Sequence, residues 1–303
     1  MSSLTLKRID HVESSELVPS GLSDGADSKS SSTPQIHPTE IDRIYLGNFI
    51  DIARSLPDQT VDLIIADPPY NASKGGEWAW DRRAGLPGFG GNWKKVAEVW
   101  DDMSLDEYFA FTGRWLEEAR RVLKPSGSMW VHGTYHNAGI INVAMQMLRI
   151  EIINEIIWYK RNSFPNLSGR RLTASHETIL WAHSGRKRQY TFNYRHSKEG
   201  EFKEDRLKVS GKQMRTVWDI PNNKAGDELQ YGKHPTQKPE RLIRRMIQLS
   251  AKPGSLCFVP FVGSGSECVA AIKEGLHFIG CEIDPGYFEI AQKRISSTSR
   301  SLV

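Results

Sequence analysis

Four consecutive residues, Asp67-Pro68-Pro69-Tyr70, offer the most specific chemistry in this 303-residue sequence. They follow an apolar, β-branched run, Val61–Ala66, which is typical of a strand buried on both faces of a parallel sheet. Because the two prolines have no N–H to donate, they end the strand and place Asp67 at its carboxyl end, where open α/β sheets bind ligands. An ordinary Pro-Pro turn with a structural aspartate is the alternative interpretation.

These groups suit the activation of an exocyclic amine on a nucleic-acid base. Such an amine is a poor nucleophile because its lone pair is conjugated into the ring. The Asp67 carboxylate and the Pro68 carbonyl can both accept its hydrogens and so free the lone pair, while the ring of Tyr70 offers a face for stacking. A base inside a duplex must be flipped out to reach such a pocket. We therefore predict Asp67, Pro68, Pro69 and Tyr70 as catalytic residues.

A second group of residues, nearer the C-terminus, has the layout of a nucleoside-binding βαβ unit. A glycine turn at 261–265 follows a predicted strand, and a helix and a second strand ending in Glu282 come next. Gly263 and Gly265 permit close approach of the backbone to a ligand, and Glu282 suits ribose hydroxyls. Cys268 stands where a dinucleotide fingerprint has its third glycine, so a diphosphate is not indicated. S-adenosylmethionine, which carries an adenosyl group and an activated methyl but no phosphate, fits both groups of residues.

Three motifs together, at 67–70 (DPPY), 234–239 (HPTQKP) and 261–265 (FVGSG), resemble the bacterial DNA amino-methyltransferases. The catalytic motif precedes the cofactor motif, which is similar to the permuted β class of that family. The resemblance covers residues 40–296. It implies an α/β, Rossmann-like, doubly wound sheet of seven mostly parallel strands with one reversed strand, plus a smaller target-recognition lobe. It also implies S-adenosylmethionine as cofactor and no metal. The implied cofactor-binding residues are Asp67, His234, Thr236, Lys238, Phe261, Gly263, Ser264, Gly265, Ser266 and Glu282.

The resemblance also bears on the substrate. Within the family, Asp at position 67 leans toward N6 of adenine, and Ser there would lean toward N4 of cytosine. The stretches 165–168, 176–181 and 211–214 are similar to a subgroup of adenine methylases from GATC restriction systems that also accept single-stranded DNA. The resemblance therefore implies double-stranded DNA as a partner. Single-stranded DNA, a cognate restriction endonuclease and a second copy of the chain are further candidate partners. Methylation of cytosine N4, of RNA or of protein glutamine stays open.

One position departs from the family pattern. The family has Asp immediately before the Pro-Phe of the cofactor motif, where it helps to hold the cofactor's amino group, and here that position is Val259. Asp67 is then the expected partner of the amine, since the two strand ends should be adjacent at the switch point of the sheet. The departure also keeps open a DNA-binding protein with weak or no catalysis.

Composition and periodicity predict the order of the elements. A pair of strands at 152–159 and 177–182 is expected to form an antiparallel hairpin at one edge of the sheet, and the glycine- and tryptophan-rich stretch 71–102 is expected to act as a lid. The remaining predicted strands lie at 42–46, 61–66, 128–132, 256–259 and 278–282, and the predicted helices at 49–56, 104–123, 138–148, 240–250, 266–274 and 285–295. Helical spacing places Phe109 on the apolar face of the helix at 104–123, and the stretch 124–127 is expected to be a turn. His132, at a strand end, is expected to be structural and not catalytic.

The predicted domain organisation follows from the same pattern. Residues 184–231 are polar and basic with interspersed aromatics, which favours contact with phosphates and bases as much as a solvated face. The predicted divisions are a disordered tail at 1–38, the catalytic half of the methyltransferase domain at 39–183, a target-recognition lobe at 184–231, the cofactor-binding half at 232–298, and a tail at 299–303.

Charge and cysteine content set outer limits on function. A net charge of +4 and a pI of about 8.8 permit a phosphate-bearing partner without demanding one. The three cysteines form no CxxC pair, which predicts reduced core thiols and argues against a zinc site. No apolar run is long enough to span a membrane, and the first 12 residues lack the apolar core of a signal peptide, so a cytoplasmic protein is expected.

Overall fold

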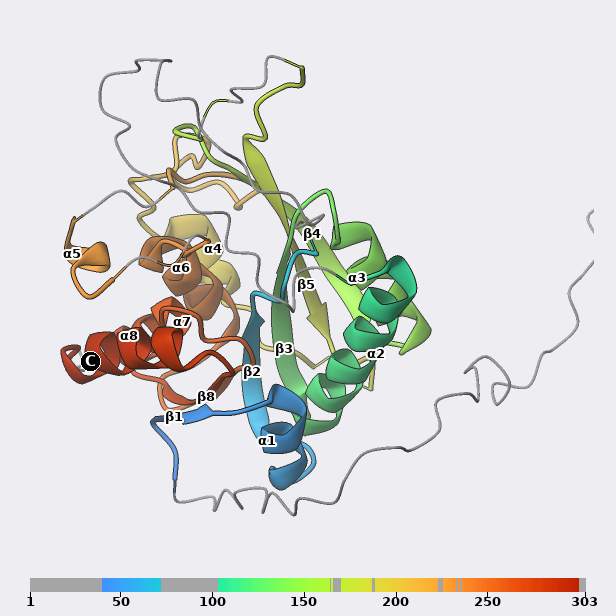
Figure 1. Cartoon of the computed structure of the whole chain (residues 1–303). Coiled ribbons are helices and arrows are strands. Elements are labelled where there is room, and N and C mark those ends of the chain that lie inside the picture. The colour runs from blue at the N-terminus through green and yellow to red at the C-terminus, as the bar shows by residue number, and fades with distance from the viewer. Residues whose placement is uncertain are drawn as a thin grey trace, which may run out of the picture. The chain divides into compact units, whose positions relative to one another are not determined.

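A single mixed β-sheet organises the described part of the chain (Figure 1). The structure, a computed structural model, describes residues 40–71, 103–163, 165, 170–186, 189–222, 226–232, 234 and 236–299. The predicted tail at 1–38 and all but the first residue of the predicted lid lie outside these residues.

The sheet has eight strands among the described residues, in the order β1-β8-β7-β2-β3-β5-β4-β6. Every strand runs in one direction except β5, which is antiparallel to both of its neighbours. The strands are β1 (Arg43–Leu46), β2 (Val61–Ala66), β3 (Leu123–Gly133), β4 (Glu151–Tyr159), β5 (His176–His183), β6 (Val217–Asp219), β7 (Leu256–Val259) and β8 (His277–Glu282). A largely parallel sheet with one reversed strand is therefore confirmed.

The expected number of seven strands is wrong by one, because β6 extends the sheet. This three-residue strand pairs in parallel with β4, so the antiparallel pair β4 and β5 does not lie at the edge as expected. Trp218 at its centre is buried, and its indole packs on that of Trp130 at 5.8 Å between ring centroids. Burial of this one large side chain holds β6 in place. The strand was not predicted because three residues within a polar stretch show no periodic pattern.

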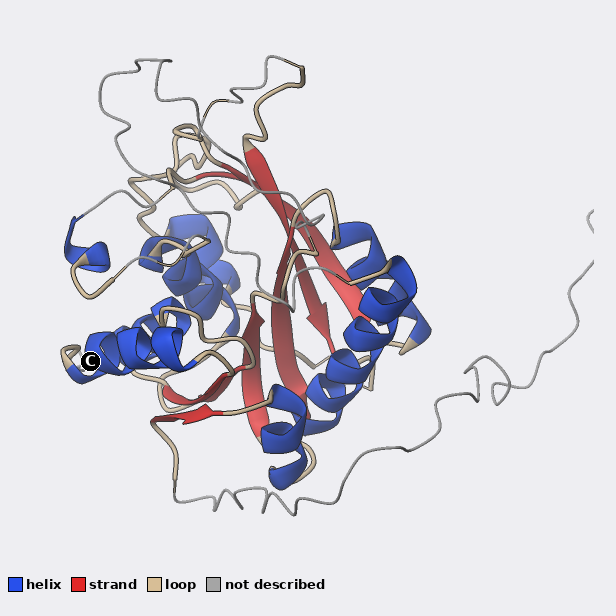
Figure 2. Cartoon of the chain, viewed as in Figure 1, coloured by secondary structure: helices blue, strands red, loops and turns tan. Residues whose placement is uncertain are grey.

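Helices cover both faces of the sheet (Figure 2). Side chains of β2 alternate between two apolar clusters: Leu63 and Ile65 pack with α6 and α7, whereas Val61, Ile64 and Ala66 pack with α1, α2 and α3. The helices are α1 (Phe49–Ser55), α2 (Leu105–Val122), α3 (Ala138–Met147), α4 (Tyr194–Glu199), α5 (Gly226–Leu229), α6 (Glu240–Ser250), α7 (Ser266–Lys273) and α8 (Pro285–Ser296). The doubly wound prediction is thus confirmed, and only the short helices α4 and α5 were not predicted.

Local sequence explains most element boundaries, with two corrections around α2. Ser104 caps the helix in a reciprocal box with Glu107, so the predicted start is confirmed. Phe109, expected on the apolar face, is instead 36% exposed, because the buried stripe runs through Tyr108 and its helical neighbours. The stretch 124–127, expected as a turn, continues strand β3.

Adjacent strand ends prepare a site at the carboxyl edge of the sheet. From β2 the chain proceeds to β3 on one side, while from β7 it proceeds to β8 on the other. The neighbouring strands β2 and β7 therefore form the topological switch point, where doubly wound sheets bind their ligands. The Asp67 motif and the glycine turn follow these two strands directly.

Three further expectations can be compared with the described residues. Cys257, Cys268 and Cys281 are buried and unpaired, as predicted. Within the ranges given above, no cluster of His, Cys, Asp or Glu side chains is arranged to hold a metal ion. None of the helices described above combines the length and the apolar character that crossing a membrane requires.

Candidate active site

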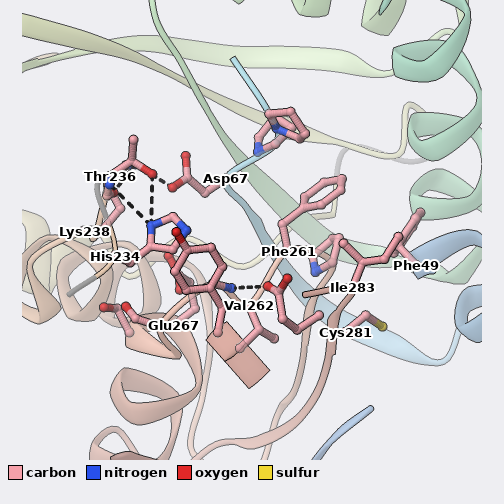
Figure 3. A pocket seen from close by; sticks show the side chains of 18 of the residues that line it. Phe49, Asp67, His234, Thr236, Lys238, Phe261, Val262, Glu267, Cys281 and Ile283 are labelled. Carbon is pink, nitrogen blue, oxygen red and sulfur yellow. Dashed lines mark hydrogen bonds and ion pairs between the residues drawn. The ribbon is translucent and has the colours of Figure 1, made fainter. Parts of the chain in front are cut away.

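One pocket at the switch point gathers nearly all of the predicted site residues (Figure 3). Residues from the Asp67 motif, the 234–239 stretch, the glycine turn and the end of β8 all line it. The predicted residues among them are Asp67, Pro68, Pro69, Tyr70, His234, Thr236, Lys238, Phe261, Gly263, Ser264, Ser266 and Glu282. Gly265 lies behind the turn instead: its φ of 85° requires glycine, and it packs against Ala291 of α8.

Both oxygens of the Asp67 carboxylate are engaged. Oδ1 accepts a hydrogen bond from the Tyr70 hydroxyl at 2.6 Å, and Oδ2 accepts one from Lys238 Nζ at 2.5 Å. Lys238 Nζ also donates to the Tyr70 hydroxyl at 2.5 Å and to the Thr236 carbonyl at 3.0 Å. An incoming amine must therefore displace or share one of these partners to reach Asp67.

Electrostatics keep Lys238 and Tyr70 in one protonation state near neutral pH. Burial by itself would lower the pKa of Lys238, but Asp67 and Glu177 outweigh it and raise that pKa above its ordinary value. Burial and the neighbouring Asp67 hold the pKa of Tyr70 well above its usual range. Lys238 thus stays an ammonium ion and Tyr70 stays a hydroxyl that donates to Asp67.

Two side chains from distant elements fix the turn after Asp67. The Pro69 carbonyl accepts hydrogen bonds from the Tyr108 hydroxyl of α2 at 2.7 Å and from Asn137 Nδ2 at 3.3 Å. Asn137 Nδ2 also donates to the Tyr108 hydroxyl at 2.9 Å. No described residue donates a hydrogen bond to the Pro68 carbonyl. The sequence offered no signal for Tyr108 or Asn137, because the fold alone brings them to the motif.

The glycine turn is tied to the end of β8. Gly263, at a φ of 51°, donates its N–H to Glu282 Oε2 at 2.6 Å, and Asp284 N–H donates to Glu282 Oε1 at 2.9 Å. Burial raises the pKa of Glu282. From behind, Arg294 Nη1 donates to the carbonyl of Ser264 at 2.8 Å and thereby fixes the floor of the turn. Glu282 is thus held rigidly at the pocket wall.

A chain of buried charges extends from Asp67 to the reversed strand. Glu177, at the start of β5, accepts a hydrogen bond from Lys160 Nζ at 3.0 Å, and its second oxygen lies 3.7 Å from Lys238 Nζ. His132, at the end of β3, is completely buried beside this chain. Burial and then Lys238 lower the pKa of His132 to about 3, so it is neutral, in keeping with the structural role expected for it. Glu177 escaped prediction because strand pairing, and not spacing, places it here.

Glu267 is a third carboxylate of the pocket that sequence reasoning missed. It stands in the first turn of α7, is 4% exposed and lines the pocket (Figure 3). Burial, and then the nearby Asp67, raise its pKa to about 7. Val259, the position where the family has an acid, is instead fully buried in an apolar cluster and does not line the pocket. An acid in the helix turn after the glycines was the available signal.

The aromatic side chains of the predicted recognition lobe, residues 184–231, are partly core residues. Phe202 and Trp218 are buried, and they pack on the guanidinium of Arg245 at 4.6 and 5.1 Å from the ring centroids. Arg245 in turn forms a buried ion pair with Asp205 at 2.6 Å. These two rings stabilise the attachment of the segment to α6, and they are not free to stack on bases.

The pocket lies at the topological switch point of a doubly wound sheet, and it joins the Asp-Pro-Pro-Tyr turn to the glycine turn. This combination is typical of methyltransferases of Rossmann-like fold. Comparison with known proteins agrees: a family model described as DNA methylase, for N6 and N4 methyltransferases, matches residues 61–293. The chain belongs to this DNA methylase family and is a DNA methyltransferase, which confirms the resemblance found in the sequence.

Individual relatives show how far the similarity extends. Over 271 residues the chain is 35% identical to the type II methyltransferase M2.DpnII of Streptococcus pneumoniae, covering 88% of this chain and 94% of that protein. Over 260 residues it is 34% identical to the type II methyltransferase M.HinfI of Haemophilus influenzae, covering 84% and 68%. The crystal structure of the M1.HpyAVI–SAM complex is similar in fold, with a TM-score of 0.59, 24% identity, and coverage of 84% of this chain and 98% of that one.

Proposed function

We propose that this DNA methyltransferase transfers a methyl group from S-adenosylmethionine to N6 of an adenine flipped out of DNA. One observation carries the proposal: Asp67 and Pro68 line the same pocket as the glycine turn and Glu282. Acceptors for an amine and a binding surface for a nucleoside are therefore contiguous. Asp at position 67 favours adenine over cytosine, as the family pattern implies.

The residues of the pocket fit this cofactor. S-adenosylmethionine supplies an activated methyl group and carries a net positive charge, and three carboxylates, Asp67, Glu267 and Glu282, line the pocket. Glu282 suits the ribose hydroxyls, and the buried ring of Phe49 together with Phe261 suits the adenine. A phosphate-bearing ligand would meet these carboxylates with like charge.

In the proposed reaction the chain binds, orients and deprotonates the target amine. Asp67 and the Pro68 carbonyl accept its two hydrogens, which frees the nitrogen lone pair to take the methyl group as the bond from that methyl to sulfur breaks. The nitrogen then has one proton too many, and the Asp67 carboxylate, which already accepts one of its hydrogens, takes that proton. Lys238 stays charged throughout and holds Asp67 in place. Tyr70 offers its ring to the flipped base.

Several finer predictions accompany this function. The family resemblance favours single-stranded DNA as an additional substrate, a cognate restriction endonuclease and a homodimer, and the cysteine content favours residence in the cytoplasm. The division into a catalytic half, a recognition lobe at 184–231 and a cofactor half also stays a prediction. β6 lies within the proposed lobe and belongs to the main sheet, so the lobe would be built onto β4.

Methylated nucleosides identify the reaction directly. DNA incubated with the protein and S-adenosylmethionine is digested and analysed by mass spectrometry. We expect N6-methyldeoxyadenosine from double-stranded DNA; N4-methyldeoxycytidine would reassign the base, and no methylated nucleoside would favour a DNA-binding protein without catalysis.

The Asp67→Ala variant tests the catalytic role in the same assay. It should lose about 100- to 1000-fold in turnover, as is typical when a group that acts in the transition state is removed. Its affinity for S-adenosylhomocysteine should stay near that of the wild type. Near-normal turnover would contradict the role of Asp67.

A further inference from the structure

We infer that Glu267 forms the ion pair with the α-ammonium group of the cofactor's methionine part. This assignment rests on S-adenosylmethionine being the ligand of the pocket. It gives Glu267 the role that the sequence alone had led us to expect of Asp67. The inference rests on which carboxylate of the pocket can still accept hydrogen bonds.

Two of the three carboxylates in the pocket are already engaged. Asp67 accepts from Tyr70 and Lys238, one on each oxygen. Glu282 accepts from two backbone N–H groups, again one on each oxygen. Glu267 accepts a hydrogen bond only from its own backbone N–H, and no other described residue donates to its carboxylate or forms an ion pair with it. A buried carboxylate left in this state is costly and gains most from a ligand that donates to it.

The charged groups around Glu267 cannot take this role. Lys238 and Arg294 are the cations that lower the pKa of the Glu267 carboxylate. Lys238 already donates to Asp67, Tyr70 and Thr236. Arg294 is buried, donates to Ser264 and Ser266 through Nη1, and pairs with Glu240 through Nη2.

The other titratable neighbours are neutral or anionic. Asp67, which follows β2, raises the pKa of Glu267 and so opposes a negative charge there. Cys257 of β7 and Cys268 of α7 are buried thiols whose pKa values are raised by burial and by Glu267 itself. Tyr70 is likewise held neutral. The site therefore has a deficit of positive charge, which a cationic ligand would remove.

Donor chemistry selects the ammonium over the sulfonium. An ammonium group carries three N–H donors for an unsatisfied carboxylate, whereas a sulfonium carries none. The sulfonium must also lie where its methyl group faces the amine held by Asp67. Val259 lies in an apolar cluster away from the pocket, and both oxygens of Glu282 accept backbone hydrogen bonds. Glu267 is therefore the carboxylate of the cofactor-binding half that is left to pair with the ammonium group.

Calorimetric titration of Glu267→Gln with three ligands tests the pairing. S-adenosylmethionine and S-adenosylhomocysteine both carry the ammonium, and 5′-methylthioadenosine lacks the amino-acid part. Loss of one charge-assisted bond should weaken the first two ligands by roughly 10- to 100-fold each and leave the third within about 3-fold of the wild type. Glu289→Gln removes an exposed helix carboxylate by the same substitution and should change none of the three.

Each departure from this pattern has a defined meaning. Weakening of S-adenosylmethionine alone would assign Glu267 to the sulfonium, and equal weakening of all three ligands would mean a change of pocket shape; either result overturns the inference, as does no change. A wild-type protein that binds neither S-adenosylmethionine nor S-adenosylhomocysteine would instead refute the proposed function.

Proton release by the wild-type protein provides a second test that needs no variant. The pKa of Glu267 is raised to about 7 in the free protein, and pairing with an ammonium group must lower it. The free protein then holds more protons than the complex near pH 7, so binding releases protons and tightens as the pH rises through 7. Titrations in buffers of different ionisation enthalpy should show release with S-adenosylhomocysteine and almost none with 5′-methylthioadenosine. Equal release with both ligands would overturn the inference.

Discussion

Lys238 is the residue on which the buried charges of the active site converge. Its ammonium group bonds to Asp67 and to Tyr70, and it lies 3.7 Å from Glu177. Since those two carboxylates keep its pKa high in spite of burial, the cation persists across the working pH range. A fixed cation beside the catalytic carboxylate orients it before substrate arrives, at the expense of one acceptor site that the target amine would otherwise use.

Substitution of Tyr70 by Phe and by Ala should separate its hydroxyl from its ring. The hydroxyl donates to Asp67 and accepts from Lys238, so Tyr70→Phe should lower kcat while KM for DNA stays near the wild-type value. Tyr70→Ala also removes the stacking surface and should raise KM by the equivalent of about 1–3 kcal/mol. Steady-state kinetics on one duplex compare them. If Phe raised KM as much as Ala, the hydroxyl and not the ring would hold the base.

Sequence motifs were sufficient for residues whose spacing along the chain is tied to their role. Asp67 directly follows the end of a strand, and Gly263 lies in a turn whose backbone conformation only glycine adopts easily. The local sequence is therefore enough to predict both residues. Glu177 and Asn137 reach the site through strand pairing and helix packing, over separations that no local pattern encodes.

The reversed strand β5 is the element that brings the second carboxylate to the site. Because it runs against its neighbours, its first residues lie at the same sheet edge as the last residues of β3. Glu177 thus meets Lys160 from β4's end and Lys238 from the segment before α6. A parallel strand in this position would place its N-terminal residues at the opposite edge.

Glu177→Gln should reveal how much this element depends on the buried charges. The substitution leaves Lys160 and Lys238, 14% and 1% exposed at their side chains, without their shared carboxylate. Removal of one partner from a buried ion pair typically costs about 3–5 kcal/mol. Urea denaturation at pH 7.5 measures the loss. Glu201→Gln, which breaks an exposed pair with Lys203, should cost less than about 1 kcal/mol, and equal losses would show that Glu177 is not an essential bridge.

Prediction at the level of elements succeeded where apolar periodicity is long. The helices predicted at 240–250 and 285–295 match α6 and α8, the second to within one residue. β6 and α5 failed because three or four residues carry too little pattern, and their positions depend on contacts made by the finished fold. Strand number was therefore the least predictable property of the sheet.

At the scale of the whole molecule, the fold buries titratable groups at the switch point and so shifts their pKa values from the ordinary ones. The imidazole of His132 is an informative case, because no described residue hydrogen-bonds to either ring nitrogen. Burial, with Lys238 nearby, lowers its pKa from 6.5 to about 3. The unfolded chain then binds more protons than the folded protein between these pH values, so the free energy of unfolding falls as the pH drops below 6.5.

Replacement of His132 by Leu should remove this contribution to acid sensitivity. At pH 8 the imidazole is neutral in both states, so the variant differs from the wild type only through packing and by less than about 1.5 kcal/mol. At pH 5 the unfolded wild-type chain gains a proton at this position that the variant cannot bind. The difference in free energy of unfolding should therefore move in the variant's favour by about 2 kcal/mol, which is 1.36 kcal/mol per pH unit over roughly 1.5 units. Urea denaturation of both proteins at pH 5 and pH 8 measures it, and an equal difference at the two pH values would mean that His132 titrates alike in the folded and unfolded states.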